Sequence, residues 1–216
     1  MNRLLVPLLG ALVLAGCSSG TAAPAGPPAA GTVHCSYPAS GTAAKPVTAP
    51  PAVASTVGMV SLTLRMTGGE VTITGDRART PCTLNAIESL AKQGYFDDTA
   101  CHRLADSTML LAQCGDPTGT GRGGPGFSFV DEIAPGTGYP AGTVAMANAG
   151  PDTNGSQFFI VYGDTALPAN YTVLGRVDAA SLKVIKTMAA EGQDNRYGDG
   201  TGKPVNAFRI LSASVG

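Results

Sequence analysis

The stretch at residues 145–160 constrains this chain more than any other part of it. It reads Ala-Met-Ala-Asn-Ala-Gly-Pro-Asp-Thr-Asn-Gly-Ser-Gln-Phe-Phe-Ile. The run is apolar at both ends and is filled with small and amide residues between them. The ends can be buried, whereas the middle leaves a nearly bare backbone that another chain can approach closely. We therefore expect a groove that holds an extended peptide.

Residues 1–16 have the layout of an export signal. Arg3 supplies a positive charge, and residues 4–14 form an apolar run too short and too broken for an ordinary membrane-spanning helix. Residues 14–17 read Leu-Ala-Gly-Cys, which resembles a bacterial lipobox, where cleavage precedes the cysteine and lipid is attached to it. We expect Cys17 to anchor the chain at the extracytoplasmic face of the cell membrane. An ordinary secretory signal with a chance cysteine is the alternative.

Residues 17–57 are expected to be the lipidated cysteine followed by a disordered linker. Of the 40 residues at 18–57, 32 are Ala, Gly, Pro, Ser or Thr. Such a composition buries too little apolar surface to offset the entropy of ordering. Only residues 33–37, Val-His-Cys-Ser-Tyr, look too specific for a spacer and could dock on the domain.

Residues 58–216 suit one domain with a real core. The formal net charge of the chain is −1, so nothing points to nucleic acid as a partner. Alternating apolar residues predict a strand at 60–66 and a return strand from Val71, and two 3.6-residue patterns predict helices at 82–93 and 179–190. The remaining apolar runs are short and strand-like, at 100–104, 109–113, 143–147, 157–162, 172–177 and 207–212. Many short strands with two helices favour a closed antiparallel barrel.

Several motifs carry little chemistry. Residues 119–124 satisfy G-x-G-x-x-G, but prolines on both sides leave no room for the helix that a dinucleotide site needs, so we expect a surface loop. Cys101 and His102 are adjacent on a strand and point to opposite faces, so they cannot act on each other. Ser156 is not in a nucleophile elbow. The acidic pair at 131–132 is expected to be solvated rather than catalytic.

The cysteines and histidines argue against metal and redox chemistry. No Cys-x-x-Cys pair is present, and His102 is the only histidine of the domain, so we expect no metal and no cofactor. Cys35, Cys82, Cys101 and Cys114 allow three disulfide pairings, and the sequence alone does not choose among them. Five residues then stand out with no nucleophile, base or metal beside them: Arg103, Gln113, Asn148, Gln157 and Phe159. A reaction that breaks no covalent bond fits this set best.

The chain resembles the cyclophilins, a family of peptidyl-prolyl cis-trans isomerases, and in particular exported cyclophilins of actinobacterial type. The motifs that carry the resemblance are Cys-His-Arg at 101–103, Gln-Cys-Gly-Asp at 113–116, the Gly-rich loop at 119–124, the run at 146–159 and Tyr-Thr-Val-Leu-Gly at 171–175. They span essentially all of residues 58–216. The resemblance implies a mainly β fold, a closed eight-stranded antiparallel barrel capped by two helices.

The resemblance also implies roles for particular residues. Arg103 would donate to the proline nitrogen of a twisted amide, with Gln113 orienting it, and Phe159 would line the proline pocket with Leu110 and Leu111. The substrate-binding set would be His102, Leu110, Leu111, Ala147, Asn148, Ala149, Gln157, Leu167 and Tyr171.

Three departures from the family pattern bear on these roles. About two extra residues separate Arg103 from Gln113, so Met109 could take the place of Leu110 in the pocket. Leu167 stands where many cyclophilins have a tryptophan that contacts cyclosporin, which implies weak binding of that compound. Tyr171 occupies a rim position that is often histidine.

Other interpretations of these residues stay open. Gln113 and Gln157 could satisfy buried backbone groups, Asn148 could be a turn former, and Arg103 could be a surface charge. Because the strands of Cys101 and Cys114 should pair as a hairpin, a disulfide between them is plausible, which leaves Cys35 to join Cys82.

The leading hypothesis is a monomeric peptidyl-prolyl isomerase that helps exported proteins fold by acting on their proline-containing segments. The first alternative is a chaperone module of the same fold that binds proline peptides without turnover. A solute-binding lipoprotein is disfavoured because such proteins are usually larger.

Overall fold

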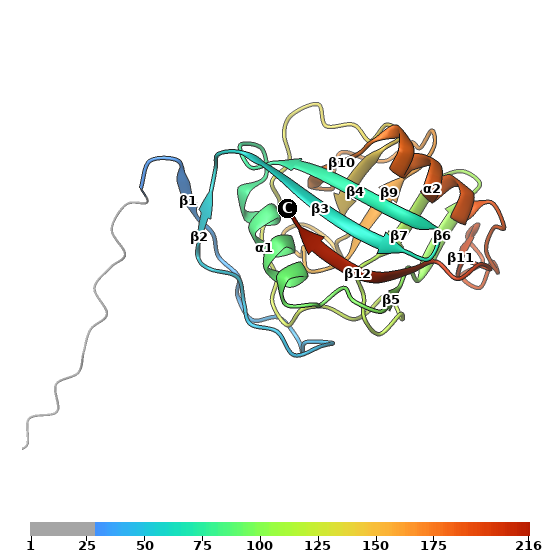
Figure 1. Cartoon of the computed structure of the whole chain (residues 1–216), viewed down its shortest axis with the longest axis horizontal. Helices are drawn as coiled ribbons and strands as arrows, with labels where there is room; N and C mark the ends of the chain where they lie inside the picture. The colour runs from blue at the N-terminus through green and yellow to red at the C-terminus, as the bar shows by residue number, and fades with distance from the viewer. Residues whose placement is uncertain (1–28) are drawn as a thin grey trace, which may run out of the picture.

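The computed structural model describes residues 29–216, which form a curled antiparallel sheet with two helices and an N-terminal arm (Figure 1). The sheet order is β11-β6-β7-β9-β8-β10-β4-β3-β12-β5. Its strands are β3 (Met59–Met66), β4 (Gly69–Asp76), β5 (Thr99–Ala100), β6 (Arg103–Asp106), β7 (Leu110–Cys114), β8 (Thr143–Met146), β9 (Phe158–Val161), β10 (Val173–Val177), β11 (Thr201–Gly202) and β12 (Arg209–Val215). The predicted mainly β, antiparallel fold with two helices is confirmed.

The sheet curls round until one segment touches both of its edges. The residues of β5 pair with β12, in the register Arg209↔Ala100, and the chain then continues into β6, which pairs with β7. Eight strands of this sheet are longer than two residues, in line with the predicted number, but among the described residues no ladder joins β6 directly to β12. Closure therefore depends on the single segment 99–106 rather than on an eighth continuous ladder.

The core lies inside the curl because strand side chains alternate between its two faces. In β3 every second residue is buried, and Leu64 is completely so. Helix α1 (Pro81–Lys92) presents the predicted stripe to this core, and Ile87 and Leu90 are fully enclosed. Helix α2 (Ala179–Ala189) lies over β4, on the other side of the barrel from α1 (Figure 1). Both helices match their predicted ranges to within a residue at each end.

Glu132 caps helix α1. Its Oε1 accepts from the backbone N–H of Cys82 at 3.0 Å, and its Oε2 accepts from that of Thr83 at 2.8 Å. The first N–H groups of a helix have no partner within it, and a carboxylate also suits the positive end of the helix dipole. Asp131 and Asp152 accept hydrogen bonds from each other's backbone N–H groups at 2.9 Å. The prediction that residues 131–132 are merely solvated is therefore wrong, because both carboxylates tie loops to the domain.

Residues 29–57 form an ordered N-terminal arm, so the prediction of a disordered linker up to residue 57 is wrong for this part. Strands β1 (Thr32–His34) and β2 (Val53–Ser55) pair with each other and lie against α1 (Figure 1). Composition did not predict the order of the arm, because the arm is held by a few specific contacts rather than by a core of its own. The predicted docking of residues 33–37 is confirmed. The predicted export signal and Cys17 lie outside the described residues.

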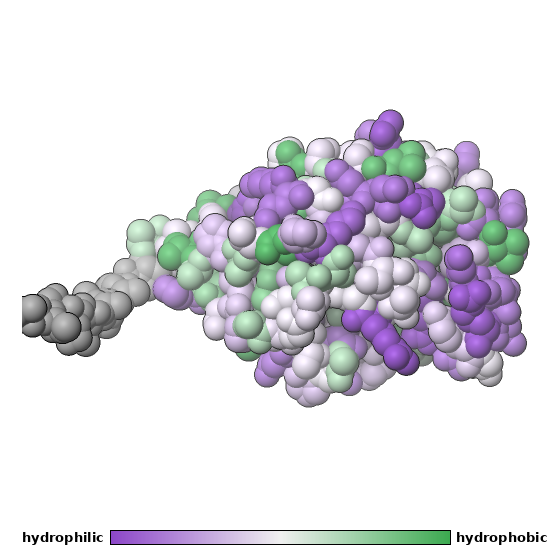
Figure 2. Space-filling model, turned by 90° about the horizontal axis from the view of Figure 1, so that it is seen from below, coloured by the Kyte–Doolittle hydropathy of each residue, from purple (hydrophilic) through white to green (hydrophobic). Residues whose placement is uncertain are grey.

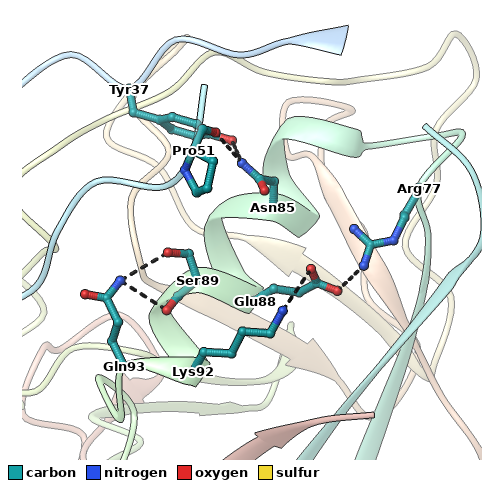
Figure 3. A network of polar contacts seen from close by, with 8 residues as sticks. All are labelled: Tyr37, Pro51, Arg77, Asn85, Glu88, Ser89, Lys92 and Gln93. Atoms are coloured by element: carbon teal, nitrogen blue, oxygen red, sulfur yellow. Dashed lines mark hydrogen bonds and ion pairs between the residues drawn. The ribbon is translucent and has the colours of Figure 1, made fainter. Parts of the chain in front are cut away.

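Tyr37 and a disulfide fasten the arm to helix α1. Cys35 is bonded to Cys82, and the Tyr37 hydroxyl donates to the Cys82 carbonyl at 2.8 Å. Asn85 donates to the Tyr37 hydroxyl at 3.0 Å and to the Pro51 carbonyl at 2.8 Å, so it bridges two passes of the arm (Figure 3). These contacts show how a segment with little apolar surface is ordered by the domain beside it.

The second disulfide joins Cys101 to Cys114, so both expected pairings are present. In the face shown in Figure 2, apolar residues are scattered among polar ones rather than gathered into one large area. Within residues 29–216, no helix has the length and apolar character needed to cross a membrane.

Candidate active site

Four neighbouring strands place the predicted site residues in one row. Arg103 on β6 lies opposite Gln113 on β7, Gln113 lies opposite Phe159 on β9, and Phe159 lies opposite Ala145 on β8. Paired residues of adjacent strands point to the same face and lie roughly 5 Å apart. Residues far apart in the sequence thus form a continuous strip on the outer face of the sheet, opposite to the core.

Phe159 lies in an apolar cluster on this outer face. The ring is only 4% exposed and contacts Tyr171 edge-on, with the ring centroids 5.2 Å apart. Tyr139 packs beside it and exchanges two hydrogen bonds with the Tyr171 backbone, at 2.9 and 2.8 Å. The cluster comprises Ala105, Leu111, Tyr139, Ala145, Phe159 and Val161, with Met109, Ala147, Leu167, Tyr171 and Val173 packed against it. We call it the outer apolar cluster.

Met109, rather than Leu110, belongs to this cluster. Alternation along β7 puts Leu111 and Gln113 on the outer face, whereas Leu110 packs against the main core. The assignment of Leu110 to the pocket is therefore wrong, and the alternative residue Met109 takes that place. Leu167 lies at the cluster as the resemblance implied.

Arg103 is held by a loop that sequence reasoning missed. Its Nε donates to the Thr201 hydroxyl at 2.9 Å, and its Nη2 donates to Asp199 Oδ2 at 3.0 Å. The guanidinium carbon also lies 5.9 Å from the centre of the Tyr197 ring. Hydrogen bonding from Thr201 is the main cause of the lowered pKa of Asp199, and Arg103 adds to it, so this carboxylate stays ionised at neutral pH.

Gln113 does not orient Arg103, contrary to the expectation. Its Nε2 donates instead to Gln157 Oε1 at 2.9 Å, and Gln157 Nε2 donates to the carbonyls of Gly121 and Gly123 at 3.0 and 2.9 Å. Gln157 thus holds backbone carbonyls of the Gly-rich loop, and it also lines the large cavity. The pair of amides links the middle of the strip to that loop.

The Gly-rich loop is wrapped around one buried carboxylate. Asp116 is fully buried, and its Oδ2 accepts from the N–H groups of Gly121 at 2.7 Å and Gly123 at 3.1 Å. Burial alone would raise the pKa of Asp116, but hydrogen bonds from Thr118, Gly123 and Gly121 together outweigh it and lower the pKa. The N–H groups of Gly121 and Gly123 are thus occupied, and the prediction of a surface loop here, with no helix after it, is confirmed.

The resemblance assigns His102 to the substrate-binding set, which would place its side chain at the surface of the groove. This prediction is wrong. The ring is 3% exposed and lies beneath Gly121, and neither ring nitrogen has a hydrogen-bond partner among the described residues. Burial is the main influence on its pKa and lowers it, against the opposite effect of Asp116. His102 therefore supports the loop in its neutral form.

Residues 147–149 follow β8 and form one wall of a cavity. The Asn148 side chain donates to the Asn170 carbonyl at 2.9 Å, so it fixes a neighbouring loop and leaves its main chain at the surface. Ala147 and Ala149 line the same cavity of about 540 Å³ with Asn148 and Gln157. A smaller depression of about 310 Å³ lies around Arg103 and shares Gln113, Gly121 and Arg122 with the first.

These features define a groove rather than a site for covalent chemistry. It carries a guanidinium at one end, an aromatic cluster beside it and a wall of small residues at the other end. Within residues 29–216, no group of three or more histidine, cysteine or acidic side chains is placed to hold a metal ion. Such a surface suits an extended peptide whose apolar ring enters the outer apolar cluster.

The chain belongs to the family described as cyclophilin type peptidyl-prolyl cis-trans isomerase, whose model matches residues 60–215. Among curated proteins it is 42% identical over 184 residues to "Probable peptidyl-prolyl cis-trans isomerase B" of Mycobacterium leprae, covering 78% of this chain and 62% of that protein. The Mycobacterium tuberculosis (strain H37Rv) protein of the same name is 41% identical over 195 residues, covering 83% of this chain and 63% of that protein. The chain thus spans less than two thirds of the length of these relatives.

Two further observations come from the same comparisons. The Mycobacterium tuberculosis match covers more of the chain than residues 60–215 alone, so the likeness extends into the segment before residue 60. Among solved structures, a cyclophilin type isomerase of Cryptosporidium parvum has a TM-score of 0.63 and 27% identity, covering 74% of this chain and 98% of the other. A structure of that same isomerase was obtained in the presence of the dipeptide Ala-Pro, with a TM-score of 0.62.

Proposed function

We propose that this chain catalyses the cis-trans isomerisation of peptide bonds that precede proline. The observation that carries the proposal is the strip Arg103–Gln113–Phe159, which sets a guanidinium on the same face of the sheet as the outer apolar cluster. Family membership and the Ala-Pro dipeptide used with the Cryptosporidium parvum isomerase support it.

The chemistry follows from amide resonance. Rotation about the bond meets a barrier of about 18–20 kcal/mol because the planar amide loses its partial double bond. In the twisted form the proline nitrogen regains a lone pair, which accepts a hydrogen bond that the planar form cannot. A donor placed at that nitrogen binds the twisted form more tightly and so lowers the barrier.

Arg103 is placed to be that donor. Its Nε and Nη2 donate to Thr201 and Asp199, whereas its Nη1 has no hydrogen-bond acceptor among the described residues. The side chain is 33% exposed, so a substrate can reach it. The two fixed hydrogen bonds hold the plane of the guanidinium, and Asp199 and Thr201 act as positioning residues.

We also propose that the chain works on exported proteins outside the cytoplasmic membrane. Both disulfides favour an oxidising compartment. The lipobox-like sequence at Cys17 favours anchorage by lipid at the extracytoplasmic face, and labelling with a palmitate analogue of wild type and Cys17→Ala in cells tests it. Proline-containing segments of unfolded exported chains would be the substrates, with no cofactor and no nucleic acid involved.

The experiment that tests the activity is exchange spectroscopy on a peptide with an Ala-Pro bond. We expect wild-type protein to speed exchange between the cis and trans signals, and Arg103→Ala to slow it while leaving the fold intact. The alternative function, a chaperone module that binds without turnover, predicts peptide binding with exchange at its spontaneous rate. Weak cyclosporin binding stays a prediction, and titration with the compound tests it.

A further inference from the structure

One wall of the large cavity comes from the N-terminal arm. Ser40, Gly41 and Thr42 line the same cavity of about 540 Å³ as Asn148 and Gln157. The arm residues belong to a segment outside the region matched by the family model. The groove of this chain is therefore completed by residues that its family domain does not supply.

The backbone of the arm is fixed at this place. Ser40 N–H donates to the Gly126 carbonyl at 2.9 Å, and Ala44 N–H donates to the Gly124 carbonyl at 2.8 Å. The Ser128 N–H donates to the Pro38 carbonyl at 3.0 Å, just before the loop. The loop at 40–42 is thus held at both ends, as a rigid wall requires.

The Tyr37 ring adds apolar packing to these bonds. It contacts Phe127 and Phe129 edge-on, with the ring centroids 5.7 and 5.8 Å apart. The contacts of Asn85 (Figure 3) and the bond between Cys35 and Cys82 add to this packing, so the arm is anchored on the domain a few residues before the loop.

The side chains of the loop remain available to a ligand. Ser40 and Thr42 are exposed, and within the described residues neither hydroxyl has a hydrogen-bond partner. The only charged residue that lines the cavity is Arg122, which is exposed and forms no ion pair in residues 29–216. Hydroxyl donors beside an unpaired guanidinium suit a short polar or acidic side chain and disfavour a basic one.

We propose that the loop Ser40–Thr42 is a specificity-determining wall of the substrate groove, selecting peptides with an acidic or short polar residue next to the Ala-Pro unit. This inference rests on the proposed function, since the ligand is the same peptide. The likeness to the mycobacterial relatives that extends into the segment before residue 60 agrees with a role for the arm.

The test compares two tryptophan variants of the full chain. Thr42→Trp fills the cavity, and Ser36→Trp places the same bulk on an exposed arm residue that does not line it. The substrates are Ala-Pro peptides whose flanking residues are in turn Glu, Ala and Lys, together with a capped Ala-Pro dipeptide. We expect wild type to prefer Glu over Lys at one flanking position, and Thr42→Trp to lower kcat/KM for that Glu peptide about tenfold.

On the capped dipeptide, Thr42→Trp should change kcat/KM less than about twofold, because this substrate does not reach the cavity. Ser36→Trp should change kcat/KM less than about twofold on every peptide, because residue 36 does not line the cavity. A second variant, Ser40→Ala with Thr42→Ala, removes both hydroxyls without adding volume and should weaken the preference for Glu about threefold. Equal losses on all peptides, or an unchanged ranking in both cavity variants, would overturn the inference.

The outcome separates this inference from the proposed function. If wild type accelerates no peptide, the proposed function fails, and the affinities of the same peptides from NMR titration decide about the wall. A Glu preference in affinity that Thr42→Trp abolishes and Ser36→Trp keeps supports the wall. Identical affinities of all peptides for wild type and Thr42→Trp contradict it.

Discussion

The two ends of the groove are built by different means. At one end Arg103 is charged and is oriented by Asp199 and Thr201, which come from a loop late in the chain. At the other end the cavity is walled by small residues and main chain, with the arm closing it. Under the proposed function, the first end distinguishes a twisted amide from a planar one, whereas the second distinguishes one peptide from another.

The two ends should therefore respond differently to substitution. Loss of a group that acts mainly in the transition state slows the reaction on every substrate, whereas loss of a wall changes only the ranking of substrates.

The largest effect is expected from a matched pair of arginine variants. Arg103→Ala should lower kcat/KM on an Ala-Pro peptide by about 10²–10³-fold, as is typical for removal of one transition-state donor. Arg122→Ala, where the depression around Arg103 meets the larger cavity, should change kcat/KM on the same peptide less than about threefold, since an exposed charge that forms no fixed contact contributes little. Exchange spectroscopy on both variants measures the rates. Similar losses of kcat/KM in the two variants would show that the rate depends on positive charge in the groove and not on the placement of Arg103.

The two disulfides should differ in what they stabilise. Replacing Cys101 and Cys114 by alanine should lower the free energy of unfolding of the barrel by roughly 3 kcal/mol, because the bond closes a loop of the core next to Arg103. Replacing Cys35 and Cys82 should mainly loosen the arm. Denaturant titration reports the first effect, and hydrogen exchange at residues 32–55 reports the second. A large loss of barrel stability in the second variant would contradict this division.

Acid should lower the free energy of unfolding through His102, the neighbour of Arg103 in the sequence. The pKa of His102 is lowered in the fold, chiefly by burial, so above about pH 6.5 both folded and unfolded states carry neutral rings and nothing changes. As the pH falls below that value the unfolded state binds a proton first. The free energy of unfolding should then fall by at most about 1.4 kcal/mol per pH unit.

Denaturant titrations between pH 7.5 and 5.5 measure this slope, and His102→Gln, which cannot titrate, should remove it. Asp116 acts in a lower range, because its lowered pKa contributes stability that is lost only as the pH falls below about 3.8. A slope that persists in His102→Gln would assign the effect to another group.

The smallest effect is expected at Asp199. Asp199→Asn keeps the shape but removes the charge that holds Nη2 of Arg103, so kcat should fall about threefold with little change in KM, as suits an exposed ion pair. Thr201→Ser keeps the hydroxyl and should leave the rate nearly unchanged. A rise in KM alone would mean that Asp199 contacts the peptide rather than positioning the arginine.

The sequence predicted the parts that depend on local pattern or on long motifs. Both helices and most strands follow from periodicity, and the motif residues Arg103, Gln113 and Phe159 lie together on neighbouring strands. The partners of Arg103 could not be found this way, because Asp199 is 96 residues further along the chain and no spacing connects them.

Other errors share a physical cause, which is that composition and motif describe a residue and not its neighbours. Residues 29–57 do have the composition of a linker, but one disulfide and the Tyr37 ring order the segment on α1. Likewise, His102 adjoins Arg103 in the sequence yet lies under Gly121, because neighbours on a strand point to opposite sides.

The segment 99–106, which touches both borders of the curled sheet, bears on the proposed function. The outermost strands β5 and β11 are each two residues long, so little unpaired backbone is left along the rims. An extended polypeptide can pair with an exposed edge strand, and such pairing leads to aggregation. Under the proposed function, a sheet with such short edge strands can bind unfolded chains repeatedly without aggregating with them.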